Sequence, residues 1–251
     1  MTAGLMDSSD MPMSVSVSDT GRVLRRCTAM LVLAAAAALP ACSTTRASDA
    51  SDLVDARAAV PGLRLDMRYA GSDNFVSMPV RGYEAPRCLL LRPAAEALAA
   101  VARDLQRDGY ALQVFDCYRP QRAVGHFVEW ARGPDDPASK QRHYPDVDKS
   151  ALLGDYIAET YGHSRGLTLD LTLARCEAGA CAPIDMGTPF DFFDERAHTD
   201  SPRITAQQRA NRERLRDAMV RHGFCNYPLE WWHYTLDRGE PQPPLLDVPV
   251  R

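Results

Sequence analysis

Hydrophobic and polar positions in the first half of the chain predict two helices and a strand. Pro93 and Gly109 bracket one helix, because proline is favoured in the first helical turn and glycine just after the last. Between them, apolar side chains recur at helical spacing, at Leu98, Val101, Ala102 and Leu105. The run 111–115 predicts a strand, and 120–131 a second helix. The stretch 133–149, rich in Pro, Asp, Lys and Arg, predicts a long surface loop.

The second half of the chain continues this mixture of elements. Leucines alternate with polar residues over 167–173, which is typical of a half-buried strand with one polar face. Thr205 with Gln208 resembles a capping box that opens a helix ending at Gly223. A last strand is expected over 228–236. Because strands and helices follow one another without regular alternation, we predict a single α+β domain, a central antiparallel sheet with helices packed on it.

Composition and charge narrow the class of protein. The chain has 251 residues, of which 45% are hydrophobic and 25% charged, so it can bury the core of one globular domain. These fractions exclude collagen, extended disorder and a multi-span membrane protein. Lys and Arg number 29 against 33 Asp and Glu, which gives a net charge of −4 without a block of five like charges. We therefore expect no nucleic-acid partner, which would require a clustered cationic face.

The first forty residues resemble an export signal. Three arginines precede the apolar run 29–39. That run fits a secretory h-region of roughly 7–15 residues and is shorter than the about 20 residues of a membrane span. It ends in Leu-Pro-Ala-Cys at Cys42, which resembles a bacterial lipobox, in which the cysteine becomes the lipid-modified first residue. Proline is not the usual residue before the small one, so simple cleavage near Ala41 stays as the alternative.

These signals predict three segments. Residues 1–41 form an N-terminal extension and a lipoprotein-type signal peptide, 42–54 a linker, and 55–251 the folded domain. We expect an exported, periplasmic protein that is anchored to the membrane only through a lipid on Cys42.

The remaining cysteines are expected to form disulfides, because thiols tend to pair in an oxidising compartment. They are Cys88, Cys117, Cys176, Cys181 and Cys225. Cys176 and Cys181 would close a small loop, Cys88 and Cys117 are the second expected pair, and Cys225 would stay free. A zinc site at the C-x4-C pair is the alternative, but no second Cys or His pair flanks it.

Two short segments combine histidines with carboxylates. His163 precedes Asp170, which lies on the polar face of a predicted strand, and Gly166 permits a tight turn between them. Glu230 stands three residues before His233. Two imidazoles and one carboxylate are a common ligand set for a catalytic zinc, and a further carboxylate can take the proton of water. The alternative is a structural hydrogen bond between His163 and Asp170.

Four motifs, in this order, resemble those of the D-alanyl-D-alanine dipeptidases. They are Tyr118-Arg119-Pro120, His163-Ser164-Arg165-Gly166 with Asp170-Leu171-Thr172-Leu173, Phe190-Asp191-Phe192 with Asp194-Glu195-Arg196, and Glu230-Trp231-Trp232-His233-Tyr234. Further segments match between and before them, at Asp73-Asn74-Phe75, Gly82-Tyr83-Glu84 and Gln121-Arg122-Ala123-Val124. The resemblance covers nearly all of residues 55–250.

The resemblance implies a role for each matched position. His163, Asp170 and His233 fall where the family has its zinc ligands, which implies one zinc ion per chain. Glu230 stands at the position of the catalytic base. Arg119 matches an arginine that stabilises negative charge on the scissile carbonyl, which suits its forked, permanent cation.

The resemblance also implies how the substrate is held. Asp191 matches a residue near the amino group of the substrate, and its carboxylate suits the ammonium of a free dipeptide. Family members commonly carry Ser-Ser directly before the metal-binding histidine, and the first serine helps to hold the amino end. This chain has Tyr161-Gly162 there. Tyr161 is therefore a candidate substrate contact with altered chemistry.

The implied activity is zinc-dependent hydrolysis of the D-alanyl-D-alanine dipeptide to two D-alanines, with a role in cell-wall peptide turnover. One alternative is a D,D-carboxypeptidase or endopeptidase that acts on peptidoglycan stem peptides. The other is a wall-peptide-binding lipoprotein without catalysis. The sequence predicts no particular oligomeric state.

Overall fold

The computed structural model describes residues 49–157 and 162–251. The expected signal peptide, the lipidation site Cys42 and the candidate contact Tyr161 lie outside the described residues. Within the described part, no helix is both long and apolar enough to cross a membrane.

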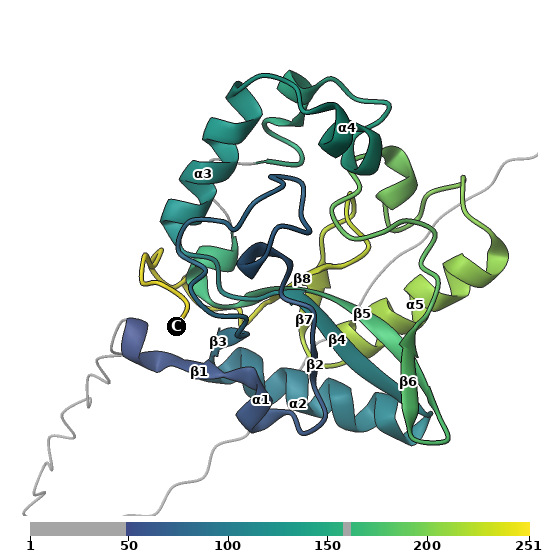
Figure 1. Ribbon diagram of the computed structural model, residues 1–251. Helices are drawn as coiled ribbons and strands as arrows, with labels where there is room; N and C mark the ends of the chain where they lie inside the picture. Colours follow the sequence, from purple (N-terminus) through teal and green to yellow (C-terminus); the bar gives the residue numbers. More distant parts are fainter. Residues whose placement is uncertain (1–48, 158–161) are drawn as a thin grey trace, which may run out of the picture. The chain divides into compact units, whose positions relative to one another are not determined.

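A six-stranded sheet forms the centre of the domain (Figure 1). Its order is β2-β4-β5-β8-β7, with β6 paired to β5, and every pairing except β2 with β4 is antiparallel. A separate antiparallel pair joins β1 to β3. The strands are β1 (Leu53–Asp55), β2 (Arg64–Leu65), β3 (Leu89–Leu91), β4 (Tyr110–Asp116), β5 (Thr168–Glu177), β6 (Ala180–Pro183), β7 (Phe224–Asn226) and β8 (His233–Leu236). The predicted α+β fold is confirmed, with one parallel pair in the sheet.

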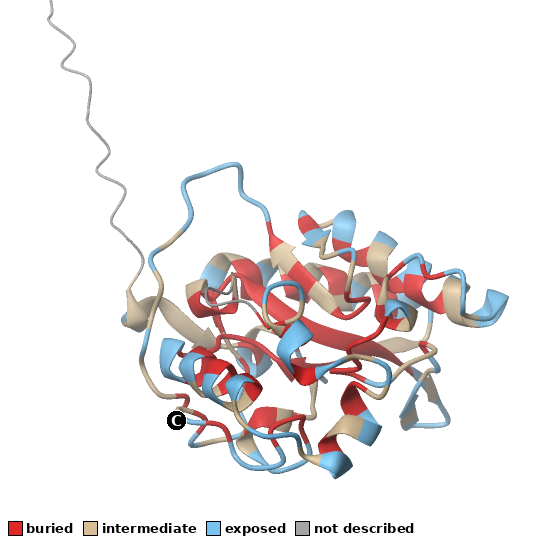
Figure 2. Cartoon of the chain, turned by 90° about the horizontal axis from the view of Figure 1, so that it is seen from above, coloured by how far each residue is buried: buried red, intermediate tan, exposed pale blue. Residues whose placement is uncertain are grey.

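Helices cover both faces of this sheet. In Figure 1, α2 lies below the strands and α5, which contacts α2 and β5, extends to the right, whereas α3 and α4 lie above the strands. Figure 2 shows that the central strands are buried between these layers. The α-helices are α1 (Ala56–Ala59), α2 (Arg92–Arg107), α3 (Gln121–Arg132), α4 (Pro137–His143) and α5 (Ala206–Val220). Short 3₁₀ helices are η1 (Ala50–Asp52), η2 (Arg68–Ala70), η3 (Lys149–Leu152), η4 (Gly162–Arg165) and η5 (Glu195–Ala197).

Three predicted elements differ from the structure. The stretch 133–149 is not a continuous loop, because it contains α4, whose first turn is capped by the Asp136 side chain. The last strand begins only at His233, since the residues before it form a turn. The run 167–173 is not half-buried, because its polar residues Thr168, Asp170 and Thr172 are as buried as its leucines.

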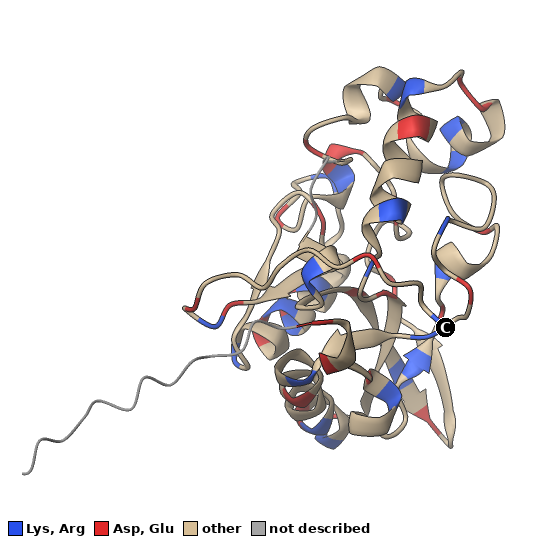
Figure 3. Ribbon diagram, turned by 90° about the vertical axis from the view of Figure 1, so that its left-hand side faces the viewer, with Lys and Arg blue, Asp and Glu red and all other residues tan. Residues whose placement is uncertain are grey.

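Charged residues of both signs are interspersed along the ribbon in the view of Figure 3. Two ion pairs hold the C-terminal segment to the domain. Arg122 Nε lies 3.0 Å from Asp247 Oδ1, and Arg251 Nε lies 2.7 Å from Glu84 Oε2. This segment reinforces the backbone around Tyr83, because Val250 N donates to Gly82 O.

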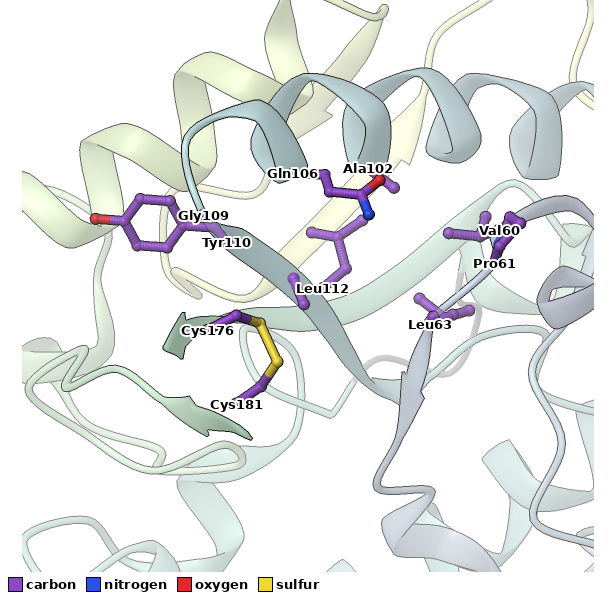
Figure 4. Close-up of a pocket in the computed structure, with 12 residues that line it drawn as sticks. Val60, Pro61, Leu63, Ala102, Gln106, Gly109, Tyr110, Leu112, Cys176 and Cys181 are labelled. Carbon is purple, nitrogen blue, oxygen red and sulfur yellow. A yellow bond between two sulfur atoms is a disulfide. The ribbon is translucent and has the colours of Figure 1, made fainter. Parts of the chain in front are cut away.

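The described part of the chain contains two disulfides, Cys88–Cys117 and Cys176–Cys181, and leaves Cys225 free and exposed. Cys88 and Cys117 are fully buried. Cys176 and Cys181 join the paired strands β5 and β6 at opposite positions. Figure 4 shows the latter disulfide beside a pocket with an apolar lining that includes Leu63.

Loss of either disulfide is expected to destabilise the domain, and Cys88–Cys117 should matter more. Its cysteines are 29 residues apart, against 5 for Cys176–Cys181. In the chain-entropy model these loops correspond to about 3.6 and about 2 kcal/mol of stability. Urea unfolding of the two double-alanine variants measures the difference. Equal losses would contradict the loop-length argument.

Candidate active site

Strand pairing places three polar side chains in one row across the sheet. Asp116 at the end of β4 lies opposite Asp170 in β5, and Asp170 lies opposite His233 in β8. The register shifts between Val114 and Asp116, so the side chains at the end of β4 are oriented differently relative to β5. Asp116 and Asp170 are buried, and His233 is nearly so. The row therefore lies inside the domain.

His163 reaches the same place from η4, the short turn before β5. Gly166 ends this turn with a φ of +73°, and a Cβ there would lie 3.0 Å from Leu53 Cδ2, so both backbone and space require glycine. His163 Nδ1 lies 2.7 Å from the backbone oxygen of Cys117. Because a carbonyl only accepts, Nδ1 carries the proton and Nε2 presents its lone pair to the row.

Three of these side chains, from η4, β5 and β8, form a small cluster of metal-ligating atoms. His163 Nε2 lies 3.3 Å from Asp170 Oδ1 and 3.3 Å from His233 Nδ1, and the last two atoms are 3.1 Å apart. Ligands about 2.0–2.1 Å from a tetrahedral zinc ion lie about 3.3 Å from one another. Among the described residues, the buried Asp170 Oδ1 has no hydrogen-bond partner. The donor set and its spacing therefore fit one metal ion.

Protonation states in this cluster suit a cation. Burial has the largest effect on the pKa of His233: it lowers this pKa and so favours the neutral imidazole. Burial opposes ionisation of Asp170, but His163 and His233 beside it outweigh burial and lower its pKa. Metal ligation requires a neutral imidazole and an ionised carboxylate. The cluster offers both.

Glu230 borders the cluster from the turn before β8. Its Oε2 lies 3.5 Å from His233 Nδ1. Asn226 holds the turn, because its Nδ2 donates to the backbone oxygens of Glu230 and His233, each at 3.0 Å. Burial raises the pKa of Glu230 well above its ordinary value, and the nearby Asp170 and Asp191 raise it further. A carboxyl group with a raised pKa is suited to accept and return protons near neutral pH.

Arg119 is fixed above the row by Asp116. Its Nε and Nη2 both lie 2.9 Å from Asp116 Oδ2, and Nη2 is 3.5 Å from Asp170 Oδ2. Tyr83 donates to the other Asp116 oxygen at 2.6 Å. The guanidinium is only 4% exposed, so its charge acts in a poorly solvated site. Sequence reasoning assigned no role to Asp116 or Tyr83, although Asp116 stands just three residues before Arg119.

Asp191 lies on the other side of the same pocket. Its backbone has a φ of +57°, which is uncommon for a residue other than glycine. Tyr69 Oη lies 3.1 and 3.0 Å from the two carboxylate oxygens. Burial raises the pKa of Asp191, and Asp170 adds to the rise. Arg119 offsets this rise only in part, so a cationic group of a ligand would stabilise the ionised carboxylate. Tyr69 carried no signal in the sequence beyond its position near a matched segment.

The pocket that these residues share is narrow, with a cavity volume of about 20 Å³. Among its lining residues are Arg119, Asp170, Asp191, Glu230 and His233, and aromatic side chains close the rest. The pocket suits a small polar molecule.

His198 contacts Tyr156 Oη at 3.3 Å and does not belong to the ligand cluster. A Cβ at Gly162 would lie 2.6 Å from Thr168 Oγ1, which itself contacts Thr235. A serine at this position would require Thr168 to move, which explains the glycine at this departure from the family pattern.

Comparison with known proteins now adds to this geometry. A peptidase family model described as D-ala-D-ala dipeptidase matches residues 49–250. The chain belongs to this family of D-Ala-D-Ala dipeptidases. The resemblance inferred from the sequence motifs is thereby confirmed, and the chain is a peptidase of this family. All the cluster residues lie within the matched range.

Individual relatives agree with the family assignment. A D-alanyl-D-alanine dipeptidase of Enterococcus faecium is 42% identical over 194 residues, which cover 76% of this chain and 95% of the relative. One of Streptomyces coelicolor is 40% identical over 193 residues, 76% of this chain and 94% of the relative. Among solved structures, a zinc-bound vancomycin-resistance D,D-pentapeptidase aligns with 62% of this chain and 77% of its own, at 18% identity and a TM-score of 0.35.

Proposed function

We propose that this protein hydrolyses the D-alanyl-D-alanine dipeptide to two D-alanines with one zinc ion per chain. The observation that carries the proposal is the triangle of His163, Asp170 and His233 ligand atoms, with Glu230 beside it in a small buried pocket. The dipeptidase names of the full-length relatives support the choice of substrate. When bound, zinc supplies a Lewis acid that polarises a carbonyl group and lowers the pKa of water at the site.

The protein's own groups would then handle protons and charge. Glu230 takes the proton of the attacking water and later returns it to the nitrogen of the leaving D-alanine. Arg119, held by Asp116, faces the pocket and stabilises the negative charge that develops on the carbonyl oxygen. Because Asp116 fixes the guanidinium in advance, little reorganisation is needed in the transition state.

Substrate selection follows from the size and charge of the pocket. Asp191, supported by the Tyr69 hydroxyl, would bind the ammonium of the dipeptide. An ammonium in this place would stabilise the ionised form of the buried carboxylate. A long peptide offers no free ammonium at the same distance from its scissile bond. This arrangement favours a free dipeptide over a wall stem peptide.

The proposal is tested by release of free D-alanine from zinc-loaded protein. We expect turnover of D-Ala-D-Ala to exceed that of L-Ala-L-Ala and of a pentapeptide ending in D-Ala-D-Ala. Faster turnover of the pentapeptide would replace the dipeptidase by a D,D-carboxypeptidase. Zinc binding without turnover of any of them would favour a wall-peptide-binding protein.

We further propose that the protein is exported and acts in cell-wall peptide turnover. The basic and apolar residues before Cys42 support export, and the two disulfides of the domain are compatible with an oxidising compartment. An exported dipeptidase would meet dipeptides released from the wall.

Cys42→Ala is expected to release the protein from the membrane, because it removes the predicted site of lipid attachment. Fractionation of cells that express the full chain measures the change, with Cys225→Ala as the matched cysteine control. A Cys42→Ala protein that stays in the membrane fraction would overturn the lipoprotein prediction.

A further inference from the structure

The Cys88–Cys117 disulfide lies directly against the candidate metal site. Cys117 contributes the backbone oxygen that accepts from His163 Nδ1 at 2.7 Å, and it stands two residues before Arg119. Both half-cystines are fully buried. The orientation of a metal-binding imidazole is set by the partner of its other nitrogen. The position of the Cys117 backbone therefore bears on zinc affinity.

The strand that follows Cys88 ties the same two segments together. Tyr118 N donates to Leu89 O at 2.9 Å, which joins β3 to the end of β4. Leu91 N donates to Gly166 O at 2.8 Å, which joins β3 to the turn of His163. These hydrogen bonds place β3 as a bridge between the carbonyl of Cys117 and the imidazole that it orients. The disulfide adds the one covalent link to this bridge.

We propose that the Cys88–Cys117 disulfide is a positioning element of the metal site, and that it raises zinc affinity by fixing the Cys117 carbonyl toward His163. This inference rests on the metal site of the proposed function. Without the disulfide, β3 and the Cys117 segment are held only by backbone hydrogen bonds and packing. The Cys117 oxygen, which accepts the hydrogen bond from His163 Nδ1, then becomes more mobile. As a result, His163 Nε2 is oriented less accurately toward the metal ion.

The disulfide also makes zinc affinity depend on oxidation. Its formation joins the two Sγ atoms and releases two protons. The two electrons pass to a protein disulfide of the exported compartment, which is reduced to two thiols. Thiols are kept reduced in the cytosol. The metal site would therefore reach full affinity only where Cys88 and Cys117 have been oxidised.

The second disulfide provides a matched control. Cys176–Cys181 joins β5 to β6 at the outer part of the sheet, and the pocket beside it shares no lining residue with the active-site pocket in the described part of the chain (Figure 4). Loss of either bond lowers the stability of the domain. Only loss of Cys88–Cys117 should change zinc affinity.

The test is the zinc dissociation constant of three oxidised proteins, measured by competition with a chromogenic chelator at a temperature where each is folded. We expect Cys88→Ala/Cys117→Ala to bind zinc about 10–100-fold more weakly than wild type, the usual cost of a lost outer contact to a ligand. Cys176→Ala/Cys181→Ala should bind zinc like wild type. If the first variant fails to fold, Cys88→Val/Cys117→Ala refills the volume of the sulfurs and replaces it.

Two outcomes would overturn the inference, and they are distinguishable. If wild type binds zinc and both double variants bind it equally well, the disulfide has no positioning role, while the proposed function stands. If wild type binds no zinc, the proposed metal site itself is wrong, and the inference falls with it. Circular dichroism of each protein at the assay temperature establishes that folded states are compared.

Discussion

Glu230→Gln is expected to lower kcat/KM for D-Ala-D-Ala about 10²–10⁴-fold, the contribution of a positioned general base. This corresponds to about 3–5 kcal/mol of transition-state stabilisation. The side chain is 10% exposed and its Oε2 lies 3.5 Å from His233 Nδ1, so it borders the metal cluster without belonging to the triangle of ligand atoms. Glutamine keeps its shape but cannot accept the proton of water. The loss should therefore appear mainly in kcat.

Zinc content and fold should be unchanged in this variant, because the three ligand atoms remain. Glu129→Gln is the matched control, since Glu129 lies exposed on α3 and pairs only with Arg81 in the described part of the chain. Steady-state kinetics with metal analysis of both variants measures the effect. Activity of Glu230→Gln near that of Glu129→Gln would remove Glu230 from the mechanism.

Local patterns predicted the elements that carry the site. Alternating leucines identified the strand of Asp170, and proline and glycine marked the helix that became α2. The pairing that brings the ligands together is not visible in any one segment. His163 and His233 are 70 residues apart, and their contact depends on the register of β5 with β8. Family motifs supplied this grouping because they compare whole chains.

Local sequence patterns could not identify the residues that support the site indirectly. Tyr69 meets Asp191 across 122 residues, and Tyr83 meets Asp116 across 33. A tyrosine in a sequence gives no sign that its hydroxyl will be buried against a carboxylate. The α4 helix was not predicted because its local sequence is also typical of a loop. It is short, and its Asp136 cap lies among charged residues that are equally typical of a loop.

Removal of zinc is expected to abolish hydrolysis and to destabilise the domain, because the pocket then contains uncompensated buried charge. Asp170, Asp191 and Glu230, which line the pocket, are at most 8% exposed, and Arg119 is the cationic residue among the described lining residues. A divalent cation bound at Asp170 would favour the ionised forms of these carboxyl groups. At free zinc a thousand-fold above Kd, binding stabilises the folded state by about 4 kcal/mol. This corresponds to a Tm shift of about 8–16 °C at this chain length.

The sign of the pH dependence follows from the raised pKa values. A carboxyl group whose pKa is raised in the folded state, as in Asp191 and Glu230, favours folding at low pH and loses that contribution as pH rises. Metal-free protein should therefore become less stable as pH rises above about 4, the ordinary range of these groups. The Tm difference between zinc-bound and metal-free protein should grow from pH 5 to pH 7, because a bound cation favours the ionised forms of Asp191 and Glu230, which burial disfavours in the metal-free site.

Calorimetry of chelator-treated and zinc-restored protein at both pH values measures this difference. Glu230→Gln provides an internal check, because it removes one buried carboxyl group while keeping the ligand triangle. Its metal-free form should melt above metal-free wild type at pH 7, and the two should converge at pH 5. A metal-free wild type that hydrolyses D-Ala-D-Ala at the full rate would contradict the zinc mechanism. Equal melting of both metal-free proteins at pH 7 would show that burial of Glu230 does not destabilise the fold.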